Sequence, residues 1–266
     1  MDLFYIILIG AGGLCIGSFF NVLIFRIPRG ESIVWPASHC TSCGHQLSAL
    51  ENIPVISYLF LRGKCRSCGK SISPVYPAIE LLTALAAVFF WNAAGFNFDL
   101  PWFRNIVPIL RYASLVLLIP ISAIDIRHYI IPDRFTIPFL GLALALSFLP
   151  GQLSPLQSLL GMLAGGGTLF LLGLVGTFIL KKGDAMGFGD VKLMAYLGAL
   201  WGVKAVLLGM VFGAFLGSLT GGILILARKL DNDHRIPFGP FLGAGLVIAV
   251  FAGDWLLKAY LNLLGM

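Results

Sequence analysis

Two aspartates at the ends of apolar segments are the residues best suited to chemistry. Asp125 closes an apolar run in the stretch ISAIDIRHYIIPDRFTIP, and Asp190 opens another in GDAMGFGDVK. Two carboxylates a few ångströms apart share one proton, because both cannot readily ionise together. The ionised group can take a proton from water while its protonated partner polarises a carbonyl. The pair therefore predicts peptide hydrolysis by an aspartic dyad.

The residues around these acids have accessory interpretations. Gly187 and Gly189 leave the backbone before Asp190 without side chains, so we expect an extended peptide to approach there. Lys192 either tunes the local field or is a positive charge on the cytoplasmic side of the membrane. Asp133 follows a proline, and we expect it to cap the next helix.

Two CxxC pairs, 21 residues apart and each followed by glycine, form a second candidate centre: Cys40, Cys43, Cys65 and Cys68. Four thiolates can close a tetrahedral shell around zinc, which leaves no open position for catalysis. Two disulfides are the alternative, and they require an oxidising compartment. His39 and His45 flank the first pair, and either could replace a thiolate.

The composition shows what kind of protein must position these residues. Of the 266 residues, 58% are hydrophobic and only 11% are charged. A soluble domain of this length needs more polar surface, so we predict an all-α integral membrane protein. Lipid offers backbone groups no hydrogen-bond partners, and each span is therefore expected to be helical.

Eight apolar runs are candidate spans for about 30 Å of hydrocarbon, and the run at 190–203 is the short one. They cover residues 3–25, 76–92, 106–124, 135–150, 157–180, 190–203, 205–227 and 238–262. We divide the chain into a first helix (1–25), a cytoplasmic zinc-binding loop domain (26–75) and a seven-helix membrane core (76–266).

The basic residues orient these spans. Arg26 and Arg29 follow the first run, so the N-terminus is expected outside and the following loop inside. Eight spans then return the C-terminus to the outside and place both CxxC pairs and both aspartates at the cytoplasmic face. Most Lys and Arg residues fall on the inner side, which accounts for the net charge of +6 without a nucleic-acid partner. Asp184 is expected to be solvated in the turn before Asp190.

Small residues predict how the helices pack. Four glycines recur every fourth residue on one helical face: Gly209, Gly213, Gly217 and Gly221. Three further glycines, at 165–167, interrupt the fifth run. Such faces let helix backbones approach closely, so we expect packing rather than chemistry from them.

Long, ordered stretches of the chain resemble the type IV prepilin peptidases, also called prepilin leader peptidase/N-methyltransferases. The similar stretches are GSFFNVLIFRIPRGES, NIPVISYLFLRGKCRSCGKSISPVYPAIELLTA, IDIRHYIIPDRFTIP, GDAMGFGDVKLMAYLGA and RIPFGPFLGAG. The resemblance implies that Asp125 and Asp190 are catalytic, in a GxGD-type membrane aspartic protease, and that Asp133 is accessory. It also implies that the four cysteines bind zinc.

The same resemblance implies a substrate and a second activity. The substrate would be a prepilin or pseudopilin, cut after a glycine at the cytoplasmic face of the bacterial inner membrane. The new N-terminal residue would then be methylated from S-adenosylmethionine. No dinucleotide-type glycine motif marks a methyl-donor site. Glu80, in YPAIE, is the methyltransferase candidate, and a snorkelling or paired interfacial carboxylate is its alternative interpretation.

Other functions remain as hypotheses. A peptidase without methylation would use the same aspartates. A proton- or cation-coupled transporter would carry its acids near mid-membrane, within repeated halves. A membrane scaffold with a zinc knuckle would give no reason for two matched carboxylates.

Overall fold

The computed structural model describes residues 3–95, 102–149, 153–179, 186–227 and 236–263, and Asp184 lies outside these ranges. Across the described residues the protein is helical, and the only β pairing is two isolated bridges, His39 with Gln46 and Lys64 with Ser71. The predicted all-α fold is confirmed. The chain forms two compact units, residues 1–120 and 121–266.

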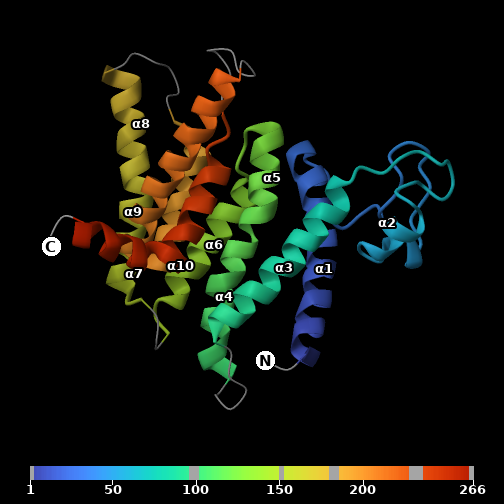
Figure 1. Ribbon diagram of the computed structural model, residues 1–266, viewed down its shortest axis with the longest axis horizontal. Helices are drawn as coiled ribbons and strands as arrows, with labels where there is room; N and C mark the ends of the chain where they lie inside the picture. The colour runs from blue at the N-terminus through green and yellow to red at the C-terminus, as the bar shows by residue number, and fades with distance from the viewer. Residues whose placement is uncertain (1–2, 96–101, 150–152, 180–185, 228–235, 264–266) are drawn as a thin grey trace. The chain divides into compact units, whose positions relative to one another are not determined.

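The first unit is built on a pair of crossing helices. Its helices are α1 (Leu3–Arg26), α2 (Ile56–Phe60), α3 (Val75–Ala94) and α4 (Trp102–Val116). Figure 1 shows α1 and α3 side by side, with the loop that carries α2 beside them. A Cβ atom at Gly17 would lie 2.6 Å from the Cα atom of Glu80, and one at Gly13 would lie 2.7 Å from that of Ala84. The two backbones therefore touch where the helices cross.

The second unit holds both aspartates. Helix α5 (Leu118–His128) leads into it, and its other helices are α6 (Asp133–Leu146), α7 (Pro155–Met162), α8 (Thr168–Ile179), α9 (Phe188–Leu226) and α10 (Gly239–Leu263). Ser154 and Gln157 form a capping box that begins α7. A π-helical turn at Leu163–Gly167 joins α7 to α8, where the sequence has its run of glycines.

Helix α9 is broken at Gly202, whose φ of 82° and ψ of 173° are accessible only to glycine. A Cβ atom at Gly165 would collide with the carbonyl oxygen of Met194 and would also lie 2.9 Å from Cγ2 of Val206. In a continuous helix, residues 194 and 206 would be about 18 Å apart. The chain therefore turns back at Gly202.

The glycine stripe of α9 packs against α10. The Cβ positions of Gly209, Gly213, Gly217 and Gly221 face, in turn, Leu246, Phe241 and Leu242, Phe238, and Ile236. The contacted residue numbers fall as the glycine numbers rise, so the second half of α9 is antiparallel to α10. The expected packing role of these glycines is confirmed.

Among the described residues, six helical segments have the length and apolar composition of membrane spans: Leu3–Arg29, Val75–Ala94, Pro108–His128, Pro155–Ile179, Phe188–Leu226 and Gly239–Leu263. The sequence predicted eight. Helix α6 has 14 residues, so it is only about 21 Å long against about 30 Å of hydrocarbon. The predicted spans 190–203 and 205–227 fall in the single broken helix α9.

Candidate active site

Asp125 lies in the last turn of α5 and is only 5% exposed. Its Oδ2 accepts a hydrogen bond of 3.0 Å from the backbone N–H of Gly239, the first residue of α10. The helix ends nearby because Tyr129 has a φ of 56°, and its N–H donates to the carbonyl oxygen of Asp125 at 2.8 Å. One oxygen of the carboxylate is thus held by a donor 114 residues away.

Asp190 lies in the first turn of α9, after the N-cap residue Gly187. Its backbone N–H donates to the carbonyl oxygen of Gly187 at 3.0 Å. Gly189, directly before Asp190, and Gly239, which donates to Asp125, both lie against Ile131, so the two acids are neighbours. Oδ1 of Asp190 is buried and finds no hydrogen-bond partner among the residues that the structure describes.

Ile131 connects the surroundings of the two acids. A Cβ atom at Gly189 would lie 2.9 Å from Cβ of Ile131, and one at Gly239 would lie 3.1 Å from its Cδ1. The same atom at Gly239 would lie 2.8 Å from Oδ2 of Asp125, and a Cβ at Gly187 would lie 2.9 Å from Oδ2 of Asp190. These glycines therefore make room for the two acids and for Ile131.

Gly239 was not predicted as a site residue, although it begins the last span in the stretch GPFLGAG. The signal available was its place at a span entry, the same place that Gly187 and Gly189 occupy before Asp190. Its role depends on a contact with α5, which no local pattern reveals.

The cap predicted at Asp133 is wrong. Asp133 is the first residue of α6, the N-cap residue is Pro132, and no side chain caps the helix. The carboxylate of Asp133 instead forms an ion pair with Lys192 of α9. Lys192 also lies over the ring of Phe188, with Nζ 5.1 Å from the ring centroid. Lys192 therefore joins the start of α9 to the start of α6.

The four cysteines form one cluster, as their spacing predicted. Their sulfur atoms all lie within 4.8 Å of one another, with 4.0 Å between Cys40 and Cys68 and 4.0 Å between Cys43 and Cys65. A tetrahedral zinc site with Zn–S bonds of about 2.3 Å places sulfurs about 3.8 Å apart. All four are free thiols, so the disulfide alternative does not match the structure.

The backbone around the cluster repeats itself. The N–H of Cys40 donates to the carbonyl of His45 at 2.9 Å, and that of Cys65 donates to the carbonyl of Lys70 at 2.8 Å. Each turn contains a glycine with positive φ, 73° at Gly44 and 70° at Gly69. These two turns are the knuckles that the glycine after each CxxC pair predicted.

Backbone donors also act on the thiols. The N–H groups of Ser42 and Cys43 lower the pKa of Cys40 to about 6, because they stabilise its thiolate. Neither histidine belongs to the cluster. Nε2 of His45 lies 3.3 Å from Oε1 of Glu51, and Nδ1 of His39 lies 3.1 Å from the carbonyl of Ala37.

Glu80 is only 7% exposed, so its side chain does not snorkel to the surface. Its Oε2 accepts a hydrogen bond of 2.7 Å from the backbone N–H of Val55. Val55 is β-branched and has a φ of 59°, an unfavourable conformation for such a residue. Glu80 thus ties a strained point of the loop to α3, within the first unit.

Comparisons with known proteins cover most of the chain. Residues 11–93 match the family described as the bacterial peptidase A24 N-terminal domain, and residues 112–226 match the type IV leader peptidase family. No solved structure matches the chain.

Similar curated proteins carry the name prepilin leader peptidase/N-methyltransferase. The protein from Myxococcus xanthus is 40% identical over 232 residues, 85% of this chain and 67% of the relative. Those from Bacillus subtilis and Pseudomonas aeruginosa are 35% and 32% identical, covering 94% and 95% of this chain and 96% and 92% of the relatives. The transporter and scaffold hypotheses account for none of these matches. The chain belongs to the type IV leader peptidase family, among the prepilin leader peptidase/N-methyltransferases.

Proposed function

We propose that this enzyme cleaves the leader of a prepilin or pseudopilin after a glycine and then N-methylates the new N-terminal residue. The observation that carries the peptidase half is the neighbourhood of Asp190 and the buried Asp125, which two separate helices bring together around Ile131. The names of the relatives support the methylase half.

The hydrogen bonds suggest how the dyad divides its work. Asp125 accepts an N–H bond from Gly239, which stabilises its ionised form, and it would take the proton from the attacking water. Asp190 has a buried oxygen without a donor among the described residues, so it would hold the shared proton and polarise the scissile carbonyl. Both groups titrate as one coupled pair. Asp133, Gly187, Gly189 and Lys192 would position this pair without taking part in the chemistry.

Zinc would be held by the four cysteine sulfurs, whose type and spacing fit a tetrahedral site. With four thiolate ligands it would have no open coordination position, so its role would be structural. The methyl group would come from S-adenosylmethionine.

We also propose that the chain crosses the bacterial inner membrane eight times, with both termini outside. Asp125 and Asp190 are neighbours, which requires an even number of crossings between them, and α6 must then cross as well as α7–α8. Asp125 also bonds to Gly239, so the two halves of α9 must cross in opposite directions. With the N-terminus outside, the acids and the four-cysteine loop face the cytoplasm.

We keep residues 1–25, 26–75 and 76–266 as the first helix, loop domain and membrane core.

Intact mass measurement tests the function. Purified enzyme in detergent, given a prepilin, should remove the leader. With S-adenosylmethionine present, the cleaved product should gain about 14 mass units, the net gain when one methyl group replaces a hydrogen. Asp125→Asn and Asp190→Asn should each slow cleavage by about 10²–10⁴-fold. Asp254→Asn, which changes an exposed acid paired with Lys204, is the matched control and should cleave normally. Normal cleavage by either dyad variant would refute the proposed active site.

A further inference from the structure

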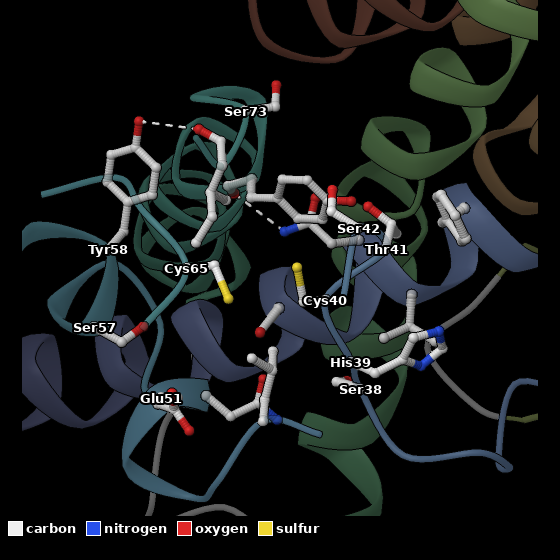
Figure 2. Close-up of a pocket in the computed structure, with 18 of the residues that line it drawn as sticks. Ser38, His39, Cys40, Thr41, Ser42, Glu51, Ser57, Tyr58, Cys65 and Ser73 are labelled. Carbon is white, nitrogen blue, oxygen red and sulfur yellow. Dashed lines mark hydrogen bonds between the residues drawn. The ribbon is translucent and has the colours of Figure 1, made fainter. Parts of the chain in front are cut away.

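A cavity of about 1010 Å³ lies inside the first unit, between the crossing of α1 with α3 and the four-cysteine cluster. Ser18, Asn21 and Arg26 line it from α1, and Tyr76 and Glu80 line it from α3. The loop supplies the opposite wall, and Figure 2 shows Cys40, Cys65, Tyr58 and Glu51 around the space. Small-molecule sites usually have volumes of about 300–1,000 Å³, so the cavity is of ligand size.

Glu80 is the feature of this cavity that points to a ligand. It is buried, and the groups that hydrogen-bond to it are neutral: the N–H of Val55 and the side chain of Ser18. In the described parts of the chain no cation forms an ion pair with it. A buried carboxylate without a counter-charge is costly, so the site favours a positively charged occupant.

The other buried charge of the cavity does not neutralise Glu80. Arg26 is 6% exposed, and its two terminal nitrogens donate to backbone carbonyls, to Ser32 at 2.9 Å and to Pro36 at 2.6 Å. Arg26 therefore fixes the wall formed by residues 32–36. That wall and the opposite side bring aromatic rings to the cavity, those of Trp35, Tyr58 and Tyr76. Such rings can stack on a planar base.

We propose that this cavity is the methyl-donor site, that Glu80 faces the positive charge of S-adenosylmethionine, and that the cysteine knuckles form one wall. This inference rests on the proposed N-methyltransferase function. The donor joins a cationic sulfur to an amino-acid head and an adenosine, which suits a buried carboxylate beside aromatic rings. Methyl transfer to an amine forms a C–N bond and breaks the methyl–sulfur bond; the sulfur loses its charge and the amine releases one proton.

The volume leaves space for the acceptor beside the donor. The cavity volume of about 1010 Å³ lies at the upper limit of the usual range of about 300–1,000 Å³ for small-molecule sites. The terminal residue of the cleaved peptide would share this space. The zinc cluster would then matter for methylation because Cys40 and Cys65 belong to a wall of the cavity.

Binding of S-adenosylmethionine to the purified full-length, zinc-loaded protein tests the inference, measured by calorimetry in detergent. Glu80→Gln keeps the volume and an oxygen that can accept the Val55 N–H, and it removes only the charge. We expect the dissociation constant to rise at least about tenfold, the scale of one lost charge contact. Zinc content and leader cleavage should stay at wild-type levels, and Asp254→Asn should bind the donor normally.

The outcomes separate this inference from the proposed function. If the wild type methylates its product but Glu80→Gln binds the donor as tightly as the wild type, the cavity assignment is wrong and the function stands. If the wild type neither binds the donor nor methylates, the cavity assignment and the proposed methyltransferase activity are both wrong, and leader cleavage is unaffected by this result.

A second measurement does not depend on the folding of a variant. An 8-azidoadenine derivative of the donor, activated by light in the wild type, should label peptides within residues 18–80. Labelling confined to residues 121–266 would overturn the inference.

Discussion

Asp125 and Asp190 have the same side chain but different surroundings. Asp125 receives a backbone N–H from the start of α10, whereas Oδ1 of Asp190 is buried without a partner among the residues described. Identical groups in unequal environments are how an acid and a base are assigned within a carboxylate pair. The difference depends on Gly239, which presents its N–H without a side chain.

Gly239→Ala should therefore impair catalysis more than folding. The new Cβ would lie 2.8 Å from Oδ2 of Asp125, the mobile end of a side chain, so the carboxylate would move. We expect kcat to fall about tenfold or more with little change in KM, because small displacements at a reacting group are costly. Gly222→Ala, where a Cβ would meet nothing within 4 Å, is the control and should keep full activity. Wild-type kcat in Gly239→Ala would show that the carboxylate position is not critical.

The carboxylate of Glu51 should make the thermal stability of the loop depend on pH. The hydroxyl and backbone N–H of Ser48, at 2.7 and 2.9 Å, and then His45 lower the pKa of Glu51 from 4.5 to about 2. A lowered pKa in the folded state contributes stability above pH 4.5, and this stability is lost as the pH falls toward 2. Glu51→Gln should thus melt at a lower temperature than the wild type at neutral pH, and the gap should close between pH 4.5 and 2. A gap that stays constant over this window in thermal unfolding would contradict the assignment.

At the scale of elements, the second unit, residues 121–266, is assembled by backbone contact at glycines. A Cβ at Gly198 would collide with the carbonyl of Gly161, and a Cβ at Gly245 would collide with that of Gly209. These collisions involve backbone atoms, which cannot rotate away as a side chain can. The positions of α7, α9 and α10 in the second unit are therefore set by where glycines fall in the sequence (Figure 1).

Gly202→Ala should destabilise the protein because alanine cannot readily adopt a φ of 82° with a ψ of 173°. We expect a loss of about 1–3 kcal/mol, seen as a lower melting temperature in detergent, since the break in α9 would be strained. Gly141→Ala in α6, where a Cβ meets nothing within 4 Å, should be neutral. Equal stability of the two variants would mean that the turn at Gly202 does not need a glycine.

The sequence was informative where the signal was local. The CxxC spacing predicted the knuckles and the cysteine cluster, and the apolar runs predicted an all-helical protein. It failed where the partner was distant: the Asp133 carboxylate pairs with Lys192, 59 residues away, and Asp125 bonds to Gly239. A helix cap was the nearest local explanation for Asp133, but a cross-helix ion pair took its place.

At the scale of the whole molecule, the two candidate sites belong to different units. The cysteine cluster and Glu80 lie in residues 1–120, and both aspartates lie in residues 121–266. Each site is built from contacts inside its own unit, so the two activities should be separable by mutation.

The double variant Cys65→Ser, Cys68→Ser tests this separation. It should reduce bound zinc, measured by mass spectrometry, from about one ion per chain to about none, since two ligands of a tetrahedral site are lost. Methylation should fall with the zinc because Cys65 lines the cavity, whereas leader cleavage should persist. Unchanged zinc content would refute the four-thiolate site, and complete loss of cleavage in a folded protein would show that the units depend on each other.

The hydrogen bond between Asp125 and Gly239 has a consequence for how this architecture can evolve. If α10 must begin at the leaflet where α5 ends, a mutation that adds or deletes one membrane segment between residues 125 and 239 would separate the two groups. Asp125 and Gly239 would then lie on opposite faces of the membrane. Only paired gains or losses would keep them together. Descendants of this chain are thus free to vary in loop length and in helix sequence, while their segment number between these points is restricted to even values.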